Sequence, residues 1–268
     1  MDISAVDEAA RIFVEARRTG IPISELPQAC RPTHTREVNA ITDAVTDILV
    51  REDGETIGGW KLGFVFSPRQ VPMICPLFDS CLFASPANVP LSLVPQRRIE
   101  PEVSFRLIAD LPPRQRPYSA PEVAEVVLAC PSLEIIDTRF DTRERSMRQM
   151  IDNPKTRLEA MADHNTTGAY ITAAGEAGWH GLDFSAMRVV MRTPAQVIVE
   201  STGGHPFTDP FLPCVVLANC MRHRGGMRAG QLLVTGSFTG FFEVPADEPV
   251  IAEFEGLGIA QATFVSGR

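Results

Sequence analysis

The sequence predicts an α+β fold in which a helical N-terminal segment precedes a strand-rich domain. Up to Gly54, apolar residues recur at the three- and four-residue spacing of amphipathic helices. From Ile57 onward, short runs of β-branched and aromatic residues follow one another, separated by Pro and Gly. Few helical patterns lie between these runs, which argues against a repeated βαβ unit. We therefore expect a helical segment over residues 1–56 and a strand-rich domain over residues 57–268.

Two helices are expected in the N-terminal segment. Ser4 and Asp7 resemble a capping box, and the apolar residues after them keep helical spacing as far as Gly20. A second helix is expected to begin near Thr35 and to end at Gly54. We interpret the pair as a lid or a packing layer.

The strand-rich domain contains two further predicted helices. One covers residues 121–129, and the other begins at residues 209–210 and continues to residue 221. The predicted strands are residues 59–65, 88–93, 99–108, 133–137, 168–172, 187–191, 196–201, 232–235, 250–254 and 259–265.

Composition narrows the classes of function. A net charge of −8 and a pI near 5.2 argue against a nucleic-acid surface, which needs clustered Lys and Arg. No apolar run approaches the length of a membrane span, and residues 1–4 lack the pattern of a secretion signal, so we expect a cytoplasmic protein. The six cysteines form no C-x-x-C pair, which predicts free thiols rather than disulfides or a zinc site.

Three carboxylates form the leading candidate site. Alternate side chains of a strand share a face, so Glu100 and Glu102 are expected side by side, and Glu134 lies inside another apolar run. Such an oxygen-rich site suits a hard divalent ion such as Mg2+ or Mn2+. The alternative is that Glu100 and Glu102 face solvent on an edge strand while Glu134 pairs with an arginine.

Four other stretches carry polar groups that are able to act in chemistry. Lys61 lies in an apolar strand between glycines, where it has a lowered pKa, holds an anionic substrate, or simply reaches solvent at a strand edge. Asp79 is a single carboxylate in an apolar setting, or a turn residue. Residues 163–168 form a polar turn able to bind a carboxylate. Residues 235–240 carry glycines and hydroxyls and can direct backbone N–H groups at an anion.

Five motifs, taken in order, resemble one family. They read Gly-Trp-Lys61-Leu-Gly, Pro-Leu-Phe-Asp79-Ser, Ile-Glu100-Pro-Glu102-Val-Ser-Phe, Leu-Glu134-Ile-Ile-Asp137-Thr-Arg139 and Leu-Leu-Val-Thr-Gly236-Ser237-Phe-Thr-Gly. Together they are similar to the 2-keto-4-pentenoate hydratase and 4-oxalocrotonate decarboxylase branch of the fumarylacetoacetate hydrolase superfamily. The likeness covers roughly residues 57–268 and implies a catalytic domain built as a mixed β-sheet roll.

The resemblance implies roles for the candidate residues. It makes Glu100, Glu102 and Glu134 the metal ligands, with Mg2+ or Mn2+ as the cofactor. It places Lys61 and Asp79 at the substrate as catalytic groups, and it assigns the substrate carboxylate to Thr235, Gly236 and Ser237.

The chain departs from the family pattern around residue 164. His164 and Thr166 stand where an asparagine and a serine are usual, and we count both as substrate-binding candidates. Arg139 or His164 is a natural partner for a second substrate carboxylate. The residue 209–221 helix lacks a tryptophan that is common in this segment, and residues 143–159 are longer and more charged than usual.

The implied activity is that of a metal-dependent lyase that adds water to a 2-hydroxy-dienoate, or its 2-oxo-4-enoate tautomer, in aromatic-compound catabolism. The closest alternative is a decarboxylase of a vinylogous 2-oxo diacid. A third is an acylpyruvate C–C hydrolase, in which His34 and Glu37 would activate water. A non-catalytic partner subunit and a small-molecule binder are the remaining alternatives. The expected partners are a small 2-oxo acid, further copies of the chain in a homo-oligomer, and a pathway partner enzyme.

Overall fold

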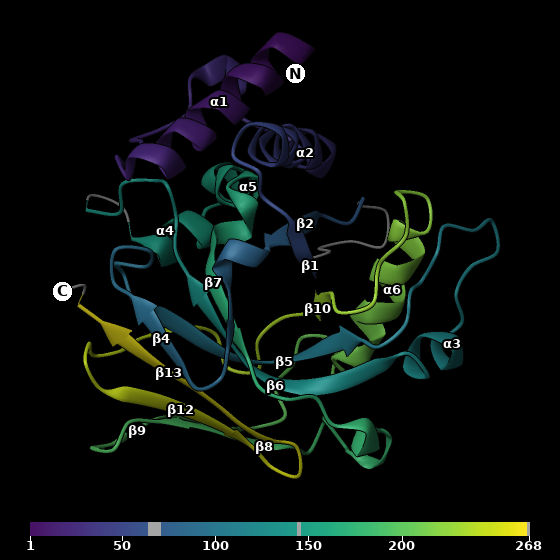
Figure 1. Ribbon diagram of the computed structural model, residues 1–268. Coiled ribbons are helices and arrows are strands. Elements are labelled where there is room, and N and C mark those ends of the chain that lie inside the picture. Colours follow the sequence, from purple (N-terminus) through teal and green to yellow (C-terminus); the bar gives the residue numbers. More distant parts are fainter. Residues whose placement is uncertain (64–70, 144–145, 267–268) are drawn as a thin grey trace. The chain divides into compact units, whose positions relative to one another are not determined.

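The computed structural model describes residues 1–63, 71–143 and 146–266 (Figure 1). Contacts between Cα atoms divide the chain into two compact units. Unit 1 comprises residues 1–56, 63–76 and 138–167, and unit 2 comprises residues 57–62, 77–137 and 168–268. The division into domains 1–56 and 57–268 stays a prediction, and the description below follows the two units.

Helices α1 (Ile3–Thr19) and α2 (Thr35–Glu52) pack against each other in unit 1, in agreement with the sequence (Figure 1). The expected capping box is wrong, because Asp2 rather than Ser4 caps α1. The side chain of Asp2 accepts a hydrogen bond of 2.9 Å from the backbone N–H of Ala5, and the Ser4 hydroxyl donates to the same carboxylate. Gly20 ends α1 in the left-handed conformation that glycine adopts without strain.

Two more helices of unit 1, α4 (Met147–Asp152) and α5 (Pro154–Ala162), correct the expectation that only two helices interrupt the strands. Ser146 begins α4 with a complete capping box that includes Gln149. The segment is rich in charged residues and its apolar positions give a weak helical pattern, which explains why the sequence did not indicate it. Two 3-10 turns, η1 (Gln28–Cys30) and η3 (His164–Thr166), complete the helices and turns described in this unit.

Unit 2 is built on two β-sheets. The first has the order β2-β1-β10-β5-β6-β7-β3, with β11 pairing with β5, and the second has the order β4-β13-β12-β8-β9. The first residues of β2 and β7 count with unit 1. The strands are β1 (Ile57–Leu62), β2 (Ile74–Phe78), β3 (Leu82–Ala84), β4 (Ala87–Pro90), β5 (Arg98–Leu107), β6 (Val127–Ile136), β7 (Thr167–Thr172), β8 (Arg188–Arg192), β9 (Val197–Thr202), β10 (Leu232–Val234), β11 (Phe242–Glu243), β12 (Pro249–Phe254) and β13 (Gly258–Val265).

All ten predicted strands correspond to observed strands, although residues 64–65 of the first lie outside the described residues. Parallel pairs (β1 with β10, β3 with β7) and antiparallel pairs (β5 with β6) occur in one sheet, so it is mixed as expected. Strands β2, β3 and β11 were not foreseen. Helix α6 (Phe211–Met221) agrees with the helix predicted from residues 209–210 to residue 221. Two short 3-10 turns of unit 2 are η2 (Asp79–Cys81) and η4 (Ala177–Gly181).

The helix expected over residues 121–129 is wrong in its second half. Helix α3 covers only Ala120–Ala124, and β6 begins at Val127. There Val127 pairs with Leu107 at the end of β5, in a ladder that continues to Ile136 opposite Arg98. This long-range pairing decides the conformation of residues whose local pattern is ambiguous.

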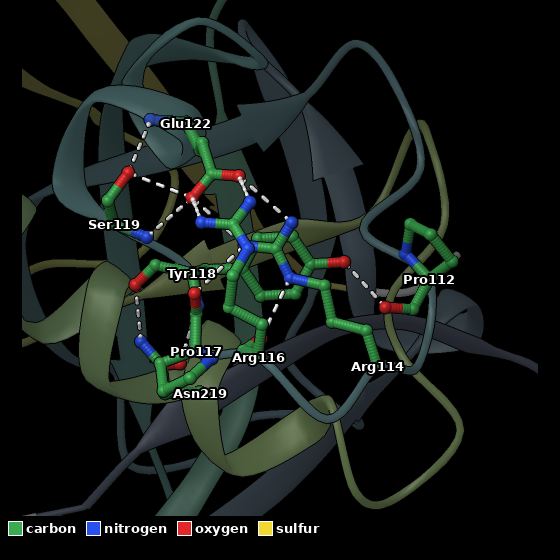
Figure 2. A network of polar contacts seen from close by, with 8 residues as sticks. All are labelled: Pro112, Arg114, Arg116, Pro117, Tyr118, Ser119, Glu122 and Asn219. Atoms are coloured by element: carbon green, nitrogen blue, oxygen red, sulfur yellow. Dashed lines mark hydrogen bonds and ion pairs between the residues drawn. The ribbon is translucent and has the colours of Figure 1, made fainter.

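A polar network fixes the loop between β5 and α3 (Figure 2). Both oxygens of the Glu122 carboxylate accept hydrogen bonds of 2.9 Å from the Arg114 guanidinium, which lies 3.5 Å above the centre of the Tyr118 ring. Glu122 also closes a capping box with Ser119 at the start of α3. The side-chain amide of Asn219 on α6 bonds to the backbone N–H and C=O of Tyr118, so the loop is held to that helix.

Successive side chains of β5 alternate between a buried, apolar face of the sheet and a polar face. Ile99, Val103 and Phe105 are completely buried, and the Phe105 ring meets Trp179 edge-on with 5.2 Å between centroids. The side chains of Glu100, Glu102 and Ser104 therefore point to the opposite face.

No helix that the structure describes has both the length and the apolar character that a membrane crossing requires.

Candidate metal centre

Strand register brings the three glutamates together. Strands β5 and β6 are antiparallel, with Glu100 opposite Glu134 and Glu102 opposite Ser132. One carboxylate oxygen from each of Glu100, Glu102 and Glu134 lies within 4.8 Å of those of the other two. The alternative with solvent-facing carboxylates on an edge strand is wrong, because β5 lies between β10 and β6 and the exposed fractions of Glu102 and Glu134 are 1% and 0%.

Burial and mutual repulsion make the metal-free cluster hold protons. Burial, followed by the charge of Glu134, raises the pKa of Glu100 to about 7. The same causes raise the pKa of Glu102 well above its ordinary value. A buried cluster whose carboxyl groups resist ionisation is one that a cation would stabilise.

Lys61 on β1 is the cationic member of the cluster. Its Nζ donates to both carboxylate oxygens of Glu134, and only 6% of its surface is exposed. Burial alone lowers the pKa of Lys61, but the charges of Glu134 and its two neighbours outweigh burial and raise the pKa above its usual value. The expectations of a lowered lysine pKa and of a solvent-reaching lysine are therefore both wrong for the metal-free protein. The partner of Glu134 is this lysine rather than an arginine.

Tyr170 on β7 is a site residue that the sequence did not indicate. Its hydroxyl donates a hydrogen bond of 3.1 Å to Oε2 of Glu102, and its ring is completely buried. Burial, followed by the charge of Glu102, holds the pKa of Tyr170 well above its usual range, so the hydroxyl keeps its proton. The hydroxyls of Ser104 and Ser132 lie 2.7 Å apart on the same sheet face. The sequence does contain a signal for Tyr170, because a tyrosine in an otherwise apolar strand needs a hydrogen-bond partner for its hydroxyl.

The Thr235-Gly236-Ser237 loop lies beside Glu102. Ser237 forms an isolated antiparallel bridge with Glu102, and Gly236 has a φ of 117°, which favours glycine. The Ser237 hydroxyl accepts hydrogen bonds from the backbone N–H groups of Thr239 and Gly240, at 3.1 and 3.0 Å. This side chain closes its own turn, and the loop brings the backbone of Gly236 and Ser237 next to the cluster.

His205 supports this loop and was also missed. Its ring packs near Phe238 with 5.4 Å between centroids. Nδ1 accepts from the backbone N–H of Phe207 at 3.3 Å, so the proton lies on Nε2, which donates to the carbonyl oxygen of Thr235 at 3.2 Å. Burial lowers the pKa of His205, which keeps the imidazole neutral.

Asp79 lies elsewhere in unit 2. It is exposed at the start of η2 and lines a cavity of about 480 Å³ whose lining includes none of the three glutamates. Its catalytic role therefore stays a prediction.

Arg139, His164 and Thr166 belong to unit 1. The Arg139 guanidinium donates to Asp163 through Nε, at 2.5 Å from Oδ1, and through Nη2, at 2.9 Å from the carbonyl oxygen. His164 is buried, and burial, followed by the charges of Arg17 and Arg139, holds its pKa well below its usual range. His164 thus carries no positive charge at neutral pH. The substrate-binding roles of these three residues stay predictions.

Comparisons with known proteins give relatives and structural neighbours, although no family model matches. The chain is 25% identical over 270 residues to a 2-keto-4-pentenoate hydratase of Paraburkholderia xenovorans, covering 98% of this chain and 96% of that protein. It is 26% identical over 144 residues, 53% of this chain, to a 4-oxalocrotonate decarboxylase of Pseudomonas putida. A solved 4-oxalocrotonate decarboxylase from Pseudomonas putida G7, complexed with magnesium and adipate, superposes with a TM-score of 0.79 over 99% of both chains, at 20% identity.

The chain is a homologue of these lyases. A putative fumarylpyruvate hydrolase from Burkholderia cenocepacia also shares the fold, with a TM-score of 0.55 over 78% of this chain at 14% identity. The resemblance to 2-keto-4-pentenoate hydratases and 4-oxalocrotonate decarboxylase is confirmed. The expected fold class is confirmed with it, including the strand-rich region and the N-terminal helices of this lyase homologue.

Proposed function

We propose that the chain is a divalent-metal-dependent lyase that adds water to a 2-hydroxy-dienoate, or to its 2-oxo-4-enoate tautomer. The observation that carries the proposal is the convergence of three glutamates, of which Glu102 and Glu134 are buried, beside a buried lysine. The full-length relative named 2-keto-4-pentenoate hydratase supports this reaction over others. Catabolism of aromatic compounds is the corresponding metabolic setting.

We assign Glu100, Glu102 and Glu134 as ligands of Mg2+ or Mn2+. Carboxylate oxygens are the donors that these hard ions prefer. Lys61 offsets one of the three negative charges when all the glutamates are ionised, and the remaining charge matches that of one divalent cation. Such an ion supplies Lewis-acid polarisation of the 2-oxygen of the substrate.

The remaining residues bind the substrate and move protons. Ser237 lies beside Glu102, and we place the substrate carboxylate at Thr235, Gly236 and Ser237, because a loop of this kind can direct backbone N–H groups at an anion. Lys61 is the proton carrier that we place at the reacting atoms, because its Nζ lies inside the cluster. Its raised pKa keeps it protonated at neutral pH, so its first act is donation from Nζ. Asp79 stays the second candidate for proton transfer.

Decarboxylation is the second candidate function. It is favoured by the solved decarboxylase of similar fold, which holds magnesium and adipate. A diacid substrate needs a partner for its second carboxylate, and Arg139 and His164 are the candidates. The Arg139 guanidinium already bonds to Asp163, and His164 is neutral, so we rank decarboxylation below hydration.

The acylpyruvate hydrolase alternative receives no support from its proposed base pair. His34 caps helix α2 through Nδ1, and its side chain is largely exposed. Glu37 bonds to the N-terminal amine and to Thr33. These contacts fix the start of a helix, and we make no hydrolase proposal.

The test uses chelator-stripped protein with 2-hydroxypenta-2,4-dienoate, with Mg2+ or Mn2+ added back. We expect metal-dependent loss of the ultraviolet absorbance of the dienol, and no carbon dioxide from 2-oxohex-3-enedioate. Glu102→Gln should abolish both metal binding and turnover, whereas Glu253→Gln, an exposed change on β12, should alter neither. Full activity and metal binding in Glu102→Gln would refute the assignment. Carbon dioxide release would move it to a decarboxylase.

Assembly is the remaining part of the proposal. We infer that the chain forms a homo-oligomer. We also propose that this homo-oligomer forms a complex with a pathway partner enzyme. Activity that appears only after a partner is mixed in would make the chain a non-catalytic subunit. Sedimentation of the purified protein decides the oligomeric state.

A further inference from the structure

Unit 2 contains a cavity of about 480 Å³ whose lining includes neither Lys61 nor any of the three proposed metal ligands. It opens where β1, η2 and β3 meet the loop before β10. The residues that line it are Ile57, Gly58, Asp79, Leu82, Phe83, Ala84, Arg106, Thr172, Arg228, Ala229, Gly230, Gln231 and Leu232.

The charged groups of the cavity favour an anion. Arg106 and Arg228 contribute guanidinium groups, and Asp79 contributes the opposing carboxylate. Nη1 of Arg106 donates to the carbonyl oxygen of Gly230 at 3.1 Å, which fixes that side chain at the wall. Among the residues that the structure describes, no carboxylate lies within ion-pairing distance of either guanidinium. The lining is therefore net positive in a chain whose net charge is −8.

The apolar residues that line the cavity favour a ligand with a short hydrocarbon tail. Leu82, Phe83 and Leu232 contribute aliphatic and aromatic surface beside the two arginines. A bare inorganic anion uses the guanidinium groups and leaves this surface in water, whereas an organic acid covers both. Asp79 disfavours a second negative charge on the ligand.

The cavity is distinct from the glutamate cluster. Glu102, Ser104 and Arg106 follow one another on the same face of β5, so Arg106 lies about 13 Å along the strand from Glu102. Leu77, Tyr170, Leu232 and Val234 form one buried core cluster, and Leu232 pairs with Arg106 across β10 and β5. Tyr170 bonds to Glu102, and Leu232 lines the cavity.

We propose that this cavity is a second ligand site, which binds a small organic monocarboxylate through Arg106 and Arg228 without a metal ion. The carboxylate accepts hydrogen bonds from the guanidinium groups, and the hydrocarbon tail packs on Leu82, Phe83 and Leu232. Pentanoate is a suitable probe, because it lacks the 2-oxygen with which the proposed substrate would chelate a metal.

The experiment measures binding of pentanoate to chelator-stripped protein by saturation-transfer NMR and by calorimetry. We expect saturable binding that persists in Glu102→Gln, with no binding of the neutral pentan-1-ol. Glutarate and inorganic phosphate should bind more weakly than pentanoate. Arg106→Gln and Arg228→Gln should each raise the dissociation constant of pentanoate about tenfold, because each removes a charge-assisted hydrogen bond. Arg188→Gln is the matched control, since this exposed arginine lies in the other sheet and pairs with Glu200.

Three results would overturn the proposal. They are absence of saturable pentanoate binding, equal affinity in wild type and both cavity variants, and dependence of binding on an added divalent ion. Phosphate binding that equals or exceeds pentanoate binding would show an inorganic anion site instead. Circular dichroism of Arg106→Gln and Arg228→Gln separates loss of the site from loss of the fold. None of these readouts involves turnover, so the result is independent of the proposed lyase reaction.

Discussion

The hydroxyl of Tyr170 donates to Oε2 of Glu102 across 3.1 Å in the dry interior of unit 2. Tyr170 comes from β7 and Glu102 from β5, with β6 between them in the sheet. A carboxylate that accepts a fixed hydrogen bond on one oxygen keeps the other oxygen in one orientation. We therefore regard Tyr170 as the residue that orients Glu102 for the proposed metal ion.

Tyr170→Phe should weaken metal binding while the fold is retained. The change removes only the hydroxyl, so we expect the Mg2+ dissociation constant to rise about 10- to 100-fold, as for other residues that orient metal ligands. Calorimetric titration of stripped protein measures it. Tyr118→Phe is the matched control, because the Tyr118 hydroxyl bonds to the carbonyl oxygen of Pro112 in a surface loop. Wild-type affinity in Tyr170→Phe would contradict the orienting role.

Metal binding should strengthen as the pH rises from about 6 to 8. The pKa of Glu100 is about 7 in the metal-free protein, so this group is largely protonated at the lower pH and must lose its proton to bind a cation. The folded state also holds more protons than the unfolded state between the ordinary carboxyl pKa and 7. In that window the metal-free protein loses stability as the pH rises.

Calorimetry at pH 6.5 in two buffers of different ionisation enthalpy counts the released protons. Glu100→Gln should release fewer protons than wild type. A binding constant that does not change with pH, without proton release, would show that the carboxylates are already ionised in the metal-free protein.

Lys61→Met should lower kcat by about a hundredfold or more, the usual contribution of a proton-transfer residue. Mg2+ should still bind to this variant above the pKa of Glu100, because all three carboxylates remain. Lys61→Arg separates the two roles of the lysine, since a guanidinium keeps the charge but does not release a proton. Full kcat in Lys61→Arg would show that Lys61 acts through its charge alone.

Gly59→Ala should destabilise the protein by about 1 to 3 kcal/mol through overpacking. A Cβ atom at residue 59 would lie 2.7 Å from the carbonyl oxygen of Leu232, a backbone atom of the paired strand β10. Gly178→Ala is the control, because a Cβ there meets no atom within 4 Å. Urea denaturation of both variants provides the free energies of unfolding. Equal stabilities would show that β1 and β10 separate without cost.

Arg139→Met should cost about 3 kcal/mol of stability, since it leaves the buried Asp163 carboxylate without its main cationic partner. The carboxylate is fully buried, and Arg139 bonds to it through both its side chain and its backbone N–H. Arg188→Met breaks an exposed pair with Glu200, whose side chains are 50% and 52% exposed, and should cost less than about 1 kcal/mol. If both changes have the same effect on the urea midpoint, the Asp163 pair has no special structural role.

The local sequence pattern predicts secondary structure correctly where residues that are close in the sequence determine the conformation. The alternation of polar and apolar residues in β5 is enough to predict that Glu100 and Glu102 share one face of the strand. The spacing of apolar residues also located α1 and α2. It failed at residues 121–129 because Val127 takes its conformation from Leu107, a partner twenty residues away in the chain.

Residue types and strand periodicity are enough to identify the carboxylates that could form an acidic centre and the strand faces on which they lie. Long-range contacts are needed to show that Glu100 faces Glu134, that Lys61 is their cation, and that Tyr170 bonds to Glu102. The tertiary structure also puts Asp79 in a different cavity from the glutamates. The reason is physical: the period of a strand fixes the face of each side chain, whereas strand order and register, which bring distant segments together, depend on packing of the whole chain.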